Sequence, residues 1–503
     1  MNKIEAIKDA KHPLDVLDDI YRYAELGWES IPEDDWDRMK WYGVFFRKTT
    51  PGFFMMRLRM PNGILTSRQL ATIGGIITDY GRDQADLTTR ENIQLRWVRI
   101  ENVPDIFARL ASVGLTSQQS GMDNMRNVVG CPIAGLDPDE ALDASGLAQA
   151  IQDSFVGVRD LSNLPRKFNA SITGCRQDCT HAGAHDLSFT PATYFVDSWP
   201  IAGFNVVVGG SLGGRDPQFA QPLNAFVRAE EVVGLNRAVL EVFRDFGSRV
   251  ARTKARLRYL IEDWGMERFR AEIEARFGEP LLPAGKDESA LAGSDHMGVH
   301  PQRQASMHYV GMNVPVGRVT GTQLTELAAL SEQYGRSEVR ITPDQNCILP
   351  YVHEDRLPEL LAEPLLSVLS PFPKPVLRGL VACTGIDYCH FSLIDTKGAA
   401  LDLEAALPGV DRDLRIHMSG CANACGQHHL GDISLLGARV RIDGEIVDAV
   451  DVAVGGRLRP GVAIPQTFAK GVPLTELPAV ISRILSGEVS PVQEVEPVLE
   501  QVK

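Results

Sequence analysis

The stretch MSGCANACGQHHLGDIS (residues 418–434) decides the fold, because the chain contains it twice. Its counterpart, 246 positions earlier, is ITGCRQDCTHAGAHDLS at residues 172–188. Two further pairs occur in the same order: MMRLRMPNG (55–63) matches YVGMNVPVG (309–317) at an offset of 254, and MRNVVGC (125–131) matches LRGLVAC (377–383) at 252. Ordered matches whose offsets drift by only a few residues predict an internal duplication.

Each copy has two parts with different patterns. The first alternates β-like runs, FFMMRLRM (53–60) and LTTRENIQLRWV (87–98), with the amphipathic helix pattern SRQLATIGGIITDYG (67–81). This order predicts a small α+β unit with helices on an antiparallel sheet. The second part contains the cysteine loops and apolar runs such as FNVVVGG (204–210), which are typical of buried strands. We therefore expect an α+β fold whose two halves are related by a pseudo-two-fold, with a cleft between them.

Four cysteines in the second copy form a candidate metal centre. Cys383 and Cys389 are spaced C-x5-C, and Cys421 and Cys425 are spaced C-x3-C. A cubane iron–sulfur cluster needs four thiolates, and the small residues of SGCANACG (419–426) let backbone N–H groups approach its sulfides. Zinc and free core thiols are the alternatives. Zinc ligands are usually spaced by two to four residues, so the five-residue gap favours the cluster.

The first copy contains fewer cysteines. Cys131, Cys175 and Cys179 match Cys383, Cys421 and Cys425, but nothing there matches Cys389. Three thiols without a fourth ligand indicate a structural relic rather than a second cluster. Cys347 stands alone in a strand pattern and is interpreted as a core residue.

Basic residues show the opposite asymmetry. The first copy contains cations where the second has neutral or acidic residues. The cations of the first copy are Arg57, Arg59, Arg90, Arg96 and Lys167. Their counterparts in the second copy include Gly311, Asn313, Asp344 and Pro350. Several of these cations lie inside apolar strand patterns, where unpaired charge is costly. Because both copies share one fold, the fold does not account for the cations. Convergence on an anion does, and arginine suits carboxylates through its planar fork of donors.

The cysteine motifs also carry a family resemblance. ACTGIDYC (382–389) and SGCANACGQHHLGDIS (419–434) resemble the signature of the sirohaem-dependent nitrite and sulfite reductases. The resemblance extends upstream through TTRENIQLR, SGMDNMRN, LPRKFN and RTKARLRYLIEDWG, and so covers nearly the whole chain. It implies a [4Fe–4S] cluster on the four second-copy cysteines, with Cys425 also bridging to the sirohaem iron.

The resemblance implies roles for further residues. The positions that match the family's oxyanion pocket are Arg57, Arg126, Lys167 and Asn169. The positions expected to contact sirohaem are Arg90, Gln94, Arg166, Lys254, Arg256 and Asn423. Within RTKARLR we expect a helix, on which Arg252/Arg256 and Lys254/Arg258 form i,i+4 pairs on different faces.

The function implied is an assimilatory six-electron reduction of nitrite to ammonia, with reduced ferredoxin as the electron donor. Ferredoxin-dependent reduction of sulfite to sulfide is the alternative. In the sulfite-reducing branch the motif that matches LPRKFN ends in a second lysine, so Asn169 favours nitrite, the less charged anion. A third possibility is an iron–sulfur protein without sirohaem.

Domain limits follow from the duplication and the resemblance. We predict ferredoxin-like half-domains and sirohaem-reductase domains in alternation, flanked by shorter segments: 1–50 (N-terminal extension), 51–118 (ferredoxin-like, copy 1), 119–280 (sirohaem-reductase, copy 1), 281–300 (linker), 301–370 (ferredoxin-like, copy 2), 371–490 (cluster-binding, copy 2) and 491–503 (tail).

Composition excludes several classes of protein. Of 503 residues, 44% are hydrophobic and 23% charged, as in globular proteins with a well-buried core. The formal net charge of −14 argues against general nucleic-acid binding. No apolar run is long enough to cross a membrane, and the N-terminus does not resemble a signal peptide. We expect a cytoplasmic monomer, in a reducing compartment that suits a cluster.

Overall fold

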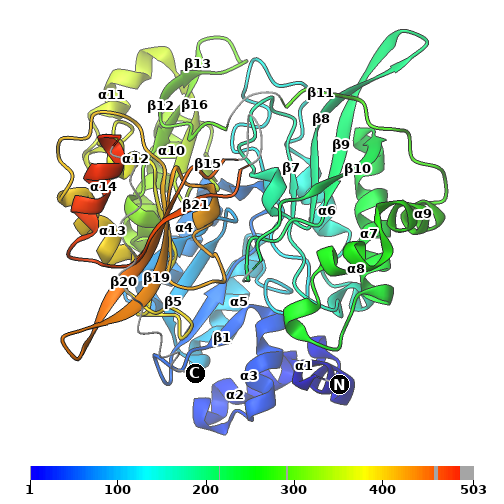
Figure 1. Cartoon of the computed structure of the whole chain (residues 1–503), viewed down its shortest axis with the longest axis horizontal. Helices are drawn as coiled ribbons and strands as arrows, with labels where there is room; N and C mark the ends of the chain where they lie inside the picture. Colours follow the sequence, from blue (N-terminus) through cyan, green and yellow to red (C-terminus); the bar gives the residue numbers. More distant parts are fainter. Residues whose placement is uncertain (1, 215, 290–292, 458–462, 488–503) are drawn as a thin grey trace.

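The duplication is visible in the order of the strands. The computed structural model describes residues 2–214, 216–289, 293–457 and 463–487, and Figure 1 shows its two halves side by side. In these ranges the strands form four sheets in two matching pairs. The predicted α+β fold with two related halves is therefore confirmed.

The first pair of sheets is antiparallel and belongs to the ferredoxin-like units. One sheet has the order β1-β2-β5-β4-β14 and the other β12-β13-β16-β15-β3. Their strands are β1 (Val44–Phe46), β2 (Phe54–Arg57), β3 (Ile64–Thr66), β4 (Ala85–Leu87), β5 (Ile93–Val98), β12 (Gly298–Pro301), β13 (Met307–Met312), β14 (Arg318–Val319), β15 (Glu338–Ile341) and β16 (Cys347–His353).

Each of these sheets takes its last strand from the other copy. In the first copy, β3 leaves its own sheet and pairs antiparallel with β15, with Leu65 opposite Val339. In return, β14 of the second copy pairs with β4, with Arg318 opposite Asp86. Residues of both units share one hydrophobic core as a result. The exchange fixes the two halves relative to one another.

Two helices continue this contact across the pseudo-two-fold. Helices α4 (Ser67–Tyr80) and α10 (Gly321–Tyr334) pack against each other. A Cβ on Gly74 would lie 2.7 Å from the Gly321 carbonyl oxygen, and one on Gly321 would lie 2.3 Å from that of Gly74. Both distances are too short for a real side chain, so the close crossing requires glycine at both positions.

The second pair of sheets combines parallel and antiparallel strands. The orders are β10-β9-β8-β7-β6 and β17-β18-β19-β20-β21, and in each sheet three parallel strands are followed by two antiparallel ones. The strands are β6 (Val129–Gly130), β7 (Ala170–Ile172), β8 (Leu187–Val196), β9 (Trp199–Val208), β10 (Gln221–Val227), β17 (Leu380–Ala382), β18 (Ile416–Ser419), β19 (Ile433–Ile442), β20 (Glu445–Val454) and β21 (Gln466–Pro473).

Helices cover these sheets, and each of the two sheets has its own core. The remaining helices are α1 (Lys3–Ala10), α2 (Leu17–Leu26), α3 (Glu33–Arg38), α5 (Val103–Ser112), α6 (Leu147–Asp153), α7 (Val232–Phe246), α8 (Leu257–Trp264), α9 (Met266–Phe277), α11 (Leu357–Leu361), α12 (Pro375–Arg378), α13 (Thr396–Ala405) and α14 (Leu477–Leu485). In the part of the chain that is described, no helix is both long and apolar enough to cross a bilayer.

The segments that flank the repeats are more structured than their composition indicates. Strand β1 lies within residues 1–50, the predicted extension, and pairs with β2. Within the predicted linker, residues 281–300, β11 (Lys286–Asp287) pairs with β8, and β12 begins the second-copy sheet. Residues 290–292 and the predicted tail, 491–503, lie outside the described residues.

Candidate active site

The second-copy cysteines lie in loops at one end of a parallel sheet. Cys383 directly follows β17, and Cys421 comes two residues after β18, which pairs parallel with β17. The carboxyl ends of parallel strands meet at one edge, where ligands commonly bind. The Gly420 N–H donates to Cys383 Sγ at 3.2 Å, and the Cys383 N–H donates to the Met418 carbonyl at 3.0 Å. These bonds hold the two loops together.

The four predicted cluster thiols share one neighbourhood. Cys383, Cys389 and Cys425 line a single cavity of about 120 Å³. Cys421 is not part of the lining, but burial raises its pKa to about 12, and the charges of Cys425, Cys389 and Cys383 add to this shift. Thr89 of the first copy donates to the Cys425 carbonyl oxygen at 3.0 Å. The second-copy loops therefore face the first copy directly.

First-copy residues complete this cavity. Of the predicted residues, Arg57 on β2, Gln94 on β5, Arg90 before β5 and Arg126 before β6 all line it. Lys167 also lies near the cavity, since the charges of Arg256, Arg90 and Cys425 all act on its pKa. The lining also includes Arg47, which we did not predict because it lies within the first 50 residues. Its position at the end of the apolar run VFF was the available signal.

The cavity contains more positive than negative charge: among the described residues that line it, Asp86 is the one carboxylate, and it already pairs with Arg96 and Lys397. Burial first, and then Arg90 and Arg47, lower the pKa of Arg57 to about 9. Burial also lowers the pKa of Arg126 well below its usual value, with Arg57 and Arg90 adding to the effect. Among the described residues, the buried guanidinium nitrogens without a hydrogen-bond partner include Nε of Arg47, Nη1 of Arg96 and Nε of Arg126. Such a concentration of buried donors indicates an anionic ligand.

Lys167 and Asn169 precede β7 on the same side of the first-copy sheet. Burial lowers the pKa of Lys167 well below its usual value, and Arg256 and Arg90 lower it further. Asn169 is buried, and its Oδ1 has no hydrogen-bond partner among the described residues. Its backbone N–H donates to Asp186 Oδ2 at 2.8 Å. Burial lowers the pKa of Arg166, which directly precedes Lys167, to about 10.

Two members of the predicted cation set have structural partners instead. Arg59 is fully buried and donates to the backbone carbonyl oxygens of Gln118 and Gln119, both at 2.7 Å. Arg96 pairs with Asp86, which also binds Lys397 and Arg318. Our prediction that Arg59 converges on a bound anion was therefore wrong, because Arg59 binds backbone carbonyl oxygens. Arg96 lies at the cavity, but its ion-pair partner is Asp86.

The basic run at residues 252–258 is not the continuous helix that we predicted. Residues Arg252–Lys254 form a 3-10 turn, and α8 begins only at Leu257. Arg252 pairs with Asp123 at 2.7 Å, and Arg256 pairs with the buried Asp186 at 2.7 Å. The i,i+4 arrangement is absent because the α-helix begins only after Arg256, and Arg252 and Arg256 each bind a different acid.

Four of the predicted cofactor contacts lie apart from the cavity lining, and Arg166 is one of them. Lys254 is exposed, Arg256 is held by Asp186, and Asn423 is exposed in the loop between Cys421 and Cys425. The structure thus brings Arg90 and Gln94 to the cysteines. It does not bring Lys254, Arg256 or Asn423 into the lining.

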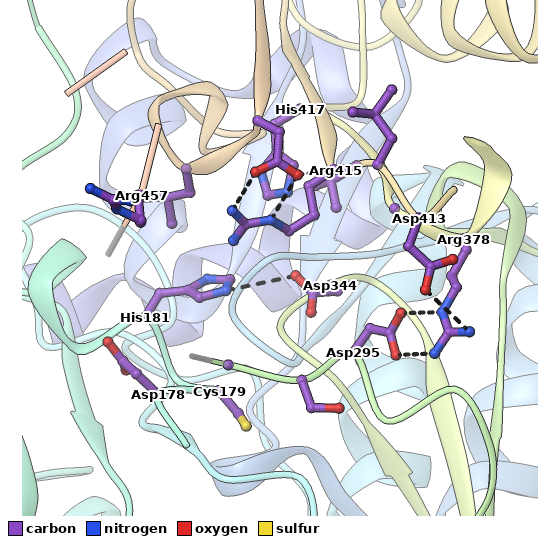
Figure 2. Close-up of a pocket in the computed structure, with 17 residues that line it drawn as sticks. Asp178, Cys179, His181, Asp295, Asp344, Arg378, Asp413, Arg415, His417 and Arg457 are labelled. Atoms are coloured by element: carbon purple, nitrogen blue, oxygen red, sulfur yellow. Dashed lines mark hydrogen bonds and ion pairs between the residues drawn. The ribbon is translucent and has the colours of Figure 1, made fainter. Parts of the chain in front are cut away.

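A larger cavity of about 360 Å³ occupies the pseudo-symmetric position, and Figure 2 shows its lining. At the repeat offsets, its Cys179, Arg378 and Asp344 correspond to Cys425, Arg126 and Arg90. Its charges pair with each other: Arg378 with Asp295, Arg415 with Asp432 at 2.7 Å, and His181 with Asp344 at 3.8 Å. The excess of unpaired cations in the smaller cavity is therefore not a property of the fold.

Two family models match the chain in the same alternating order as the sheets. The nitrite and sulphite reductase 4Fe-4S domain matches residues 121–281 and 374–486, and the nitrite/sulfite reductase ferredoxin-like half domain matches residues 46–113 and 300–366. The chain belongs to the nitrite and sulphite reductase family. The resemblance seen in the cysteine motifs is confirmed.

Individual relatives within this family match over nearly their whole length. A ferredoxin–nitrite reductase of Synechococcus elongatus is 47% identical over 497 residues, which cover 96% of each chain. An assimilatory ferredoxin-dependent nitrite reductase of Haloferax mediterranei is 40% identical, covering 94% of this chain and 86% of its own. The solved structure of the Mycobacterium tuberculosis NirA protein superposes with a TM-score of 0.91 at 32% identity, over 96% of this chain and 93% of that one.

Proposed function

We propose that this protein reduces nitrite to ammonia in nitrogen assimilation, with electrons from reduced ferredoxin. The observation that supports this most directly is the cavity in which Cys383, Cys389 and Cys425 of one copy face unbalanced arginines of the other. A small oxyanion needs such cations, and the thiols provide for an electron-transfer centre beside them. The similarity to several proteins named ferredoxin–nitrite reductase supports the same conclusion.

The residues at the cavity fit the two cofactors of the family. Four thiols that share one neighbourhood suit a [4Fe–4S] cluster, which Cys383, Cys389, Cys421 and Cys425 would hold. The sequence resemblance assigns Cys425 the contact between cluster and sirohaem. The buried guanidinium nitrogens without partners suit the carboxylates of that macrocycle. When bound, the coupled pair supplies electrons one at a time to the substrate.

The residues proposed to contact sirohaem differ in their distance from the cavity. Arg90 and Gln94 are best supported, because they line the cavity beside Cys425. Arg166, Lys254 and Asn423 require a larger reach from outside the lining. Arg256 already donates to Asp186 through Nε and Nη2, so it has less charge available for a cofactor carboxylate.

The chain's own residues then bind the substrate and deliver protons. Arg57 and Arg126 supply positive charge that favours nitrite binding and the build-up of negative charge during reduction. Breaking the N–O bonds and forming ammonia consumes protons, and Lys167 is our candidate donor because burial lowers its pKa well below that of ordinary lysine, which eases proton release. Asn169 presents a buried amide oxygen without a partner to the same region.

Asn169 also supports nitrite over sulfite. Nitrite has a single negative charge and sulfite up to two, so a neutral amide at this position suits nitrite better than a further cation would. A cytoplasmic location and a monomeric state stay predictions from the sequence.

A steady-state assay of the purified holoenzyme tests the proposal. We expect ferredoxin-supported kcat/KM to be much higher for nitrite than for sulfite, with ammonia as the product. Reduced methyl viologen in place of ferredoxin separates loss of the donor interaction from loss of catalysis. A higher kcat/KM for sulfite than for nitrite would replace the proposal with the sulfite reductase alternative.

A further inference from the structure

The first copy contains a compact group of buried thiols at the pseudo-symmetric position of the cluster cysteines. Cys131 follows β6 directly, and Cys175 and Cys179 lie in the loop after β7. Their three sulfurs all lie within 4.8 Å of one another, and each residue is at most 3% exposed. The second-copy cysteines form no such group, although all four lie in the described part of the chain.

A histidine from the segment between the two copies lies beside this group and contacts Cys179, although its ring nitrogens are not within 4.8 Å of all three sulfurs. His296 is 2% exposed, and its Nε2 lies 3.1 Å from Cys179 Sγ. The other ring nitrogen, Nδ1, lies 3.4 Å from the Tyr309 hydroxyl on β13. A histidine that binds a metal through one nitrogen usually holds a polar partner with the other, which fixes the ring and its tautomer.

The loop that presents His296 is held in an unusual conformation. His296 has a φ of 58°, in the left-handed region that residues other than glycine seldom adopt. Its backbone N–H donates to Ser294 Oγ at 3.1 Å. The neighbouring Asp295 is bound by Arg378, from the second copy, with Nη2 to Oδ1 at 3.0 Å. The surrounding contacts thus force the imidazole toward the thiols.

One of the sulfurs also accepts a backbone hydrogen bond, as metal thiolates do. The N–H of Gln177 donates to Cys175 Sγ at 3.5 Å. Apolar residues surround the group, including Ile133, Leu136 and Ile348. Cys179 also lines the larger cavity (Figure 2), which gives an ion a route to the thiols.

We propose that Cys131, Cys175, Cys179 and His296 form a second metal centre, which binds one tetrahedral zinc ion. Three thiolates and an imidazole are a common ligand set of structural zinc sites, with Zn–S bonds of about 2.3 Å. Tetrahedral angles then place the sulfurs about 3.8 Å apart, within the spacing found here. Three of the ligands belong to the first copy, and His296 belongs to the segment that leads into β12. The ion would therefore link the two halves of the molecule.

The competing explanations fit the group less well. A cubane cluster puts each cysteine on a different iron, so its thiolates stand farther apart than ligands that share one ion. Buried cysteines can also serve simply as small apolar residues, with Cys179 hydrogen-bonded to His296, but that use does not require three sulfurs within 4.8 Å of one another. In the metal-free chain Cys175 Sγ donates to Asp137 Oδ2 at 3.1 Å, and zinc binding releases this proton with those of the other two thiols.

Elemental analysis of the holoenzyme tests the proposal without reference to activity. Protein from zinc-replete cells should contain about one zinc per chain in addition to its iron. Cys175→Ser and His296→Gln should each lower zinc to near zero while iron stays unchanged. Cys347→Ser is the matched control, because Cys347 is equally buried on β16 but packs in a different hydrophobic core, and the variant should retain zinc. Tyr309→Phe should weaken zinc binding about tenfold.

X-ray absorption at the zinc edge tests the same site in the unmodified protein, in case the variants do not fold. We expect three sulfur ligands at about 2.3 Å and one nitrogen at about 2.0 Å. Less than about a tenth of an equivalent of zinc in the wild type would overturn the proposal. So would an additional iron in place of zinc, a Cys175–Cys179 disulfide in peptide mass spectra, or zinc that persists in both ligand variants.

Discussion

Arg57 and Arg126 donate to the same oxygen, the backbone carbonyl of Ser120, each through Nη1 at 3.1 Å. One shared acceptor thus holds two buried guanidinium groups side by side at the cavity. Two like charges held side by side repel each other, and a nearby anion offsets this repulsion. At the repeat offset, the counterpart of Arg126 is Arg378, which pairs with Asp295 instead. The same position of the repeat thus carries a proposed anion-binding arginine in one copy and an internal ion pair in the other.

Removing one of these charges tests the proposed substrate pocket. We expect Arg57→Gln or Arg126→Gln to lower nitrite turnover by about 10²–10³, because a pre-oriented donor near the reacting atoms is lost. The sirohaem absorption bands should persist. Arg99→Gln removes an exposed arginine that pairs with Glu101, and turnover should stay within twofold. Equal losses in all three variants would indicate a general charge effect rather than a pocket.

Lys167 predicts a specific pH dependence. A proton donor must be protonated, so turnover should fall as the pH rises through the pKa of Lys167, which is lowered from that of ordinary lysine. Lys167→Arg keeps the charge but does not release a proton, so we expect about 10²-fold lower kcat and no alkaline limb from this group. Lys374→Arg, on the surface beside Glu404, is the control. An unchanged pH profile in Lys167→Arg assigns the donor role elsewhere.

The repeats and the cysteines could be predicted from the sequence because their signals are local and ordered. The pairing of Cys421-x3-Cys425 with Cys175-x3-Cys179 gave the duplication, and the helix pattern at 67–81 is confirmed as α4. The strand exchange between β3 and β14 gave no such signal. Short strands have no periodicity of their own, and their partners are set by tertiary contacts.

The fate of individual charges was harder to predict because it depends on partners distant in the sequence. Arg57 and Arg59 lie on one strand pattern, yet only Arg57 reaches the cavity, while Arg59 binds carbonyl oxygens near residue 119. Arg256 is neutralised by Asp186, 70 residues away. His296 was missed because the composition around it indicated only a linker. To predict the role of a cation, one must know the positions of nearby carboxylates and carbonyl oxygens, and residue spacing in the sequence does not provide them.

The helix crossing can be tested with two adjacent glycines. In Gly74→Ala the new Cβ would lie 2.4 Å from Thr325 Oγ1 and 2.7 Å from the Gly321 carbonyl, so we expect a loss of about 1–3 kcal/mol in stability. Gly75→Ala meets nothing within 4 Å and should stabilise α4 by about 0.5–1 kcal/mol. Thermal unfolding of both variants measures the difference. If the two variants shift the midpoint in the same direction, the close crossing is not what requires Gly74.

Asp86 links three cations of the two copies, and its removal should be costly. Burial alone would raise the pKa of Asp86. The pKa is instead held far below its usual range by the charges of Lys397, Arg96 and Arg318. The carboxylate therefore contributes stability above the unfolded-state pKa, about 3.9, and the contribution is lost as the pH falls below that value. Asp86→Asn leaves the cations unpaired and should cost about 3–5 kcal/mol. Asp79→Asn, at an exposed ion pair with Arg109, should cost less than about 1 kcal/mol in the same thermal measurement.

Asn169→Lys is the sharpest test of substrate choice. The buried Oδ1 of Asn169 has no partner among the described residues, so the side chain can be replaced without breaking a hydrogen bond of that atom. A lysine there adds a cation beside Lys167, which favours the more highly charged sulfite. We expect the ratio of kcat/KM for sulfite to that for nitrite to rise at least about tenfold, equivalent to ~1.4 kcal/mol in differential stabilisation. Asn169→Met has similar length without the charge, so it should lower both activities without raising the ratio. If the ratio stays unchanged or falls in Asn169→Lys, Asn169 does not discriminate between the anions, and the preference for nitrite must come from the arginines alone.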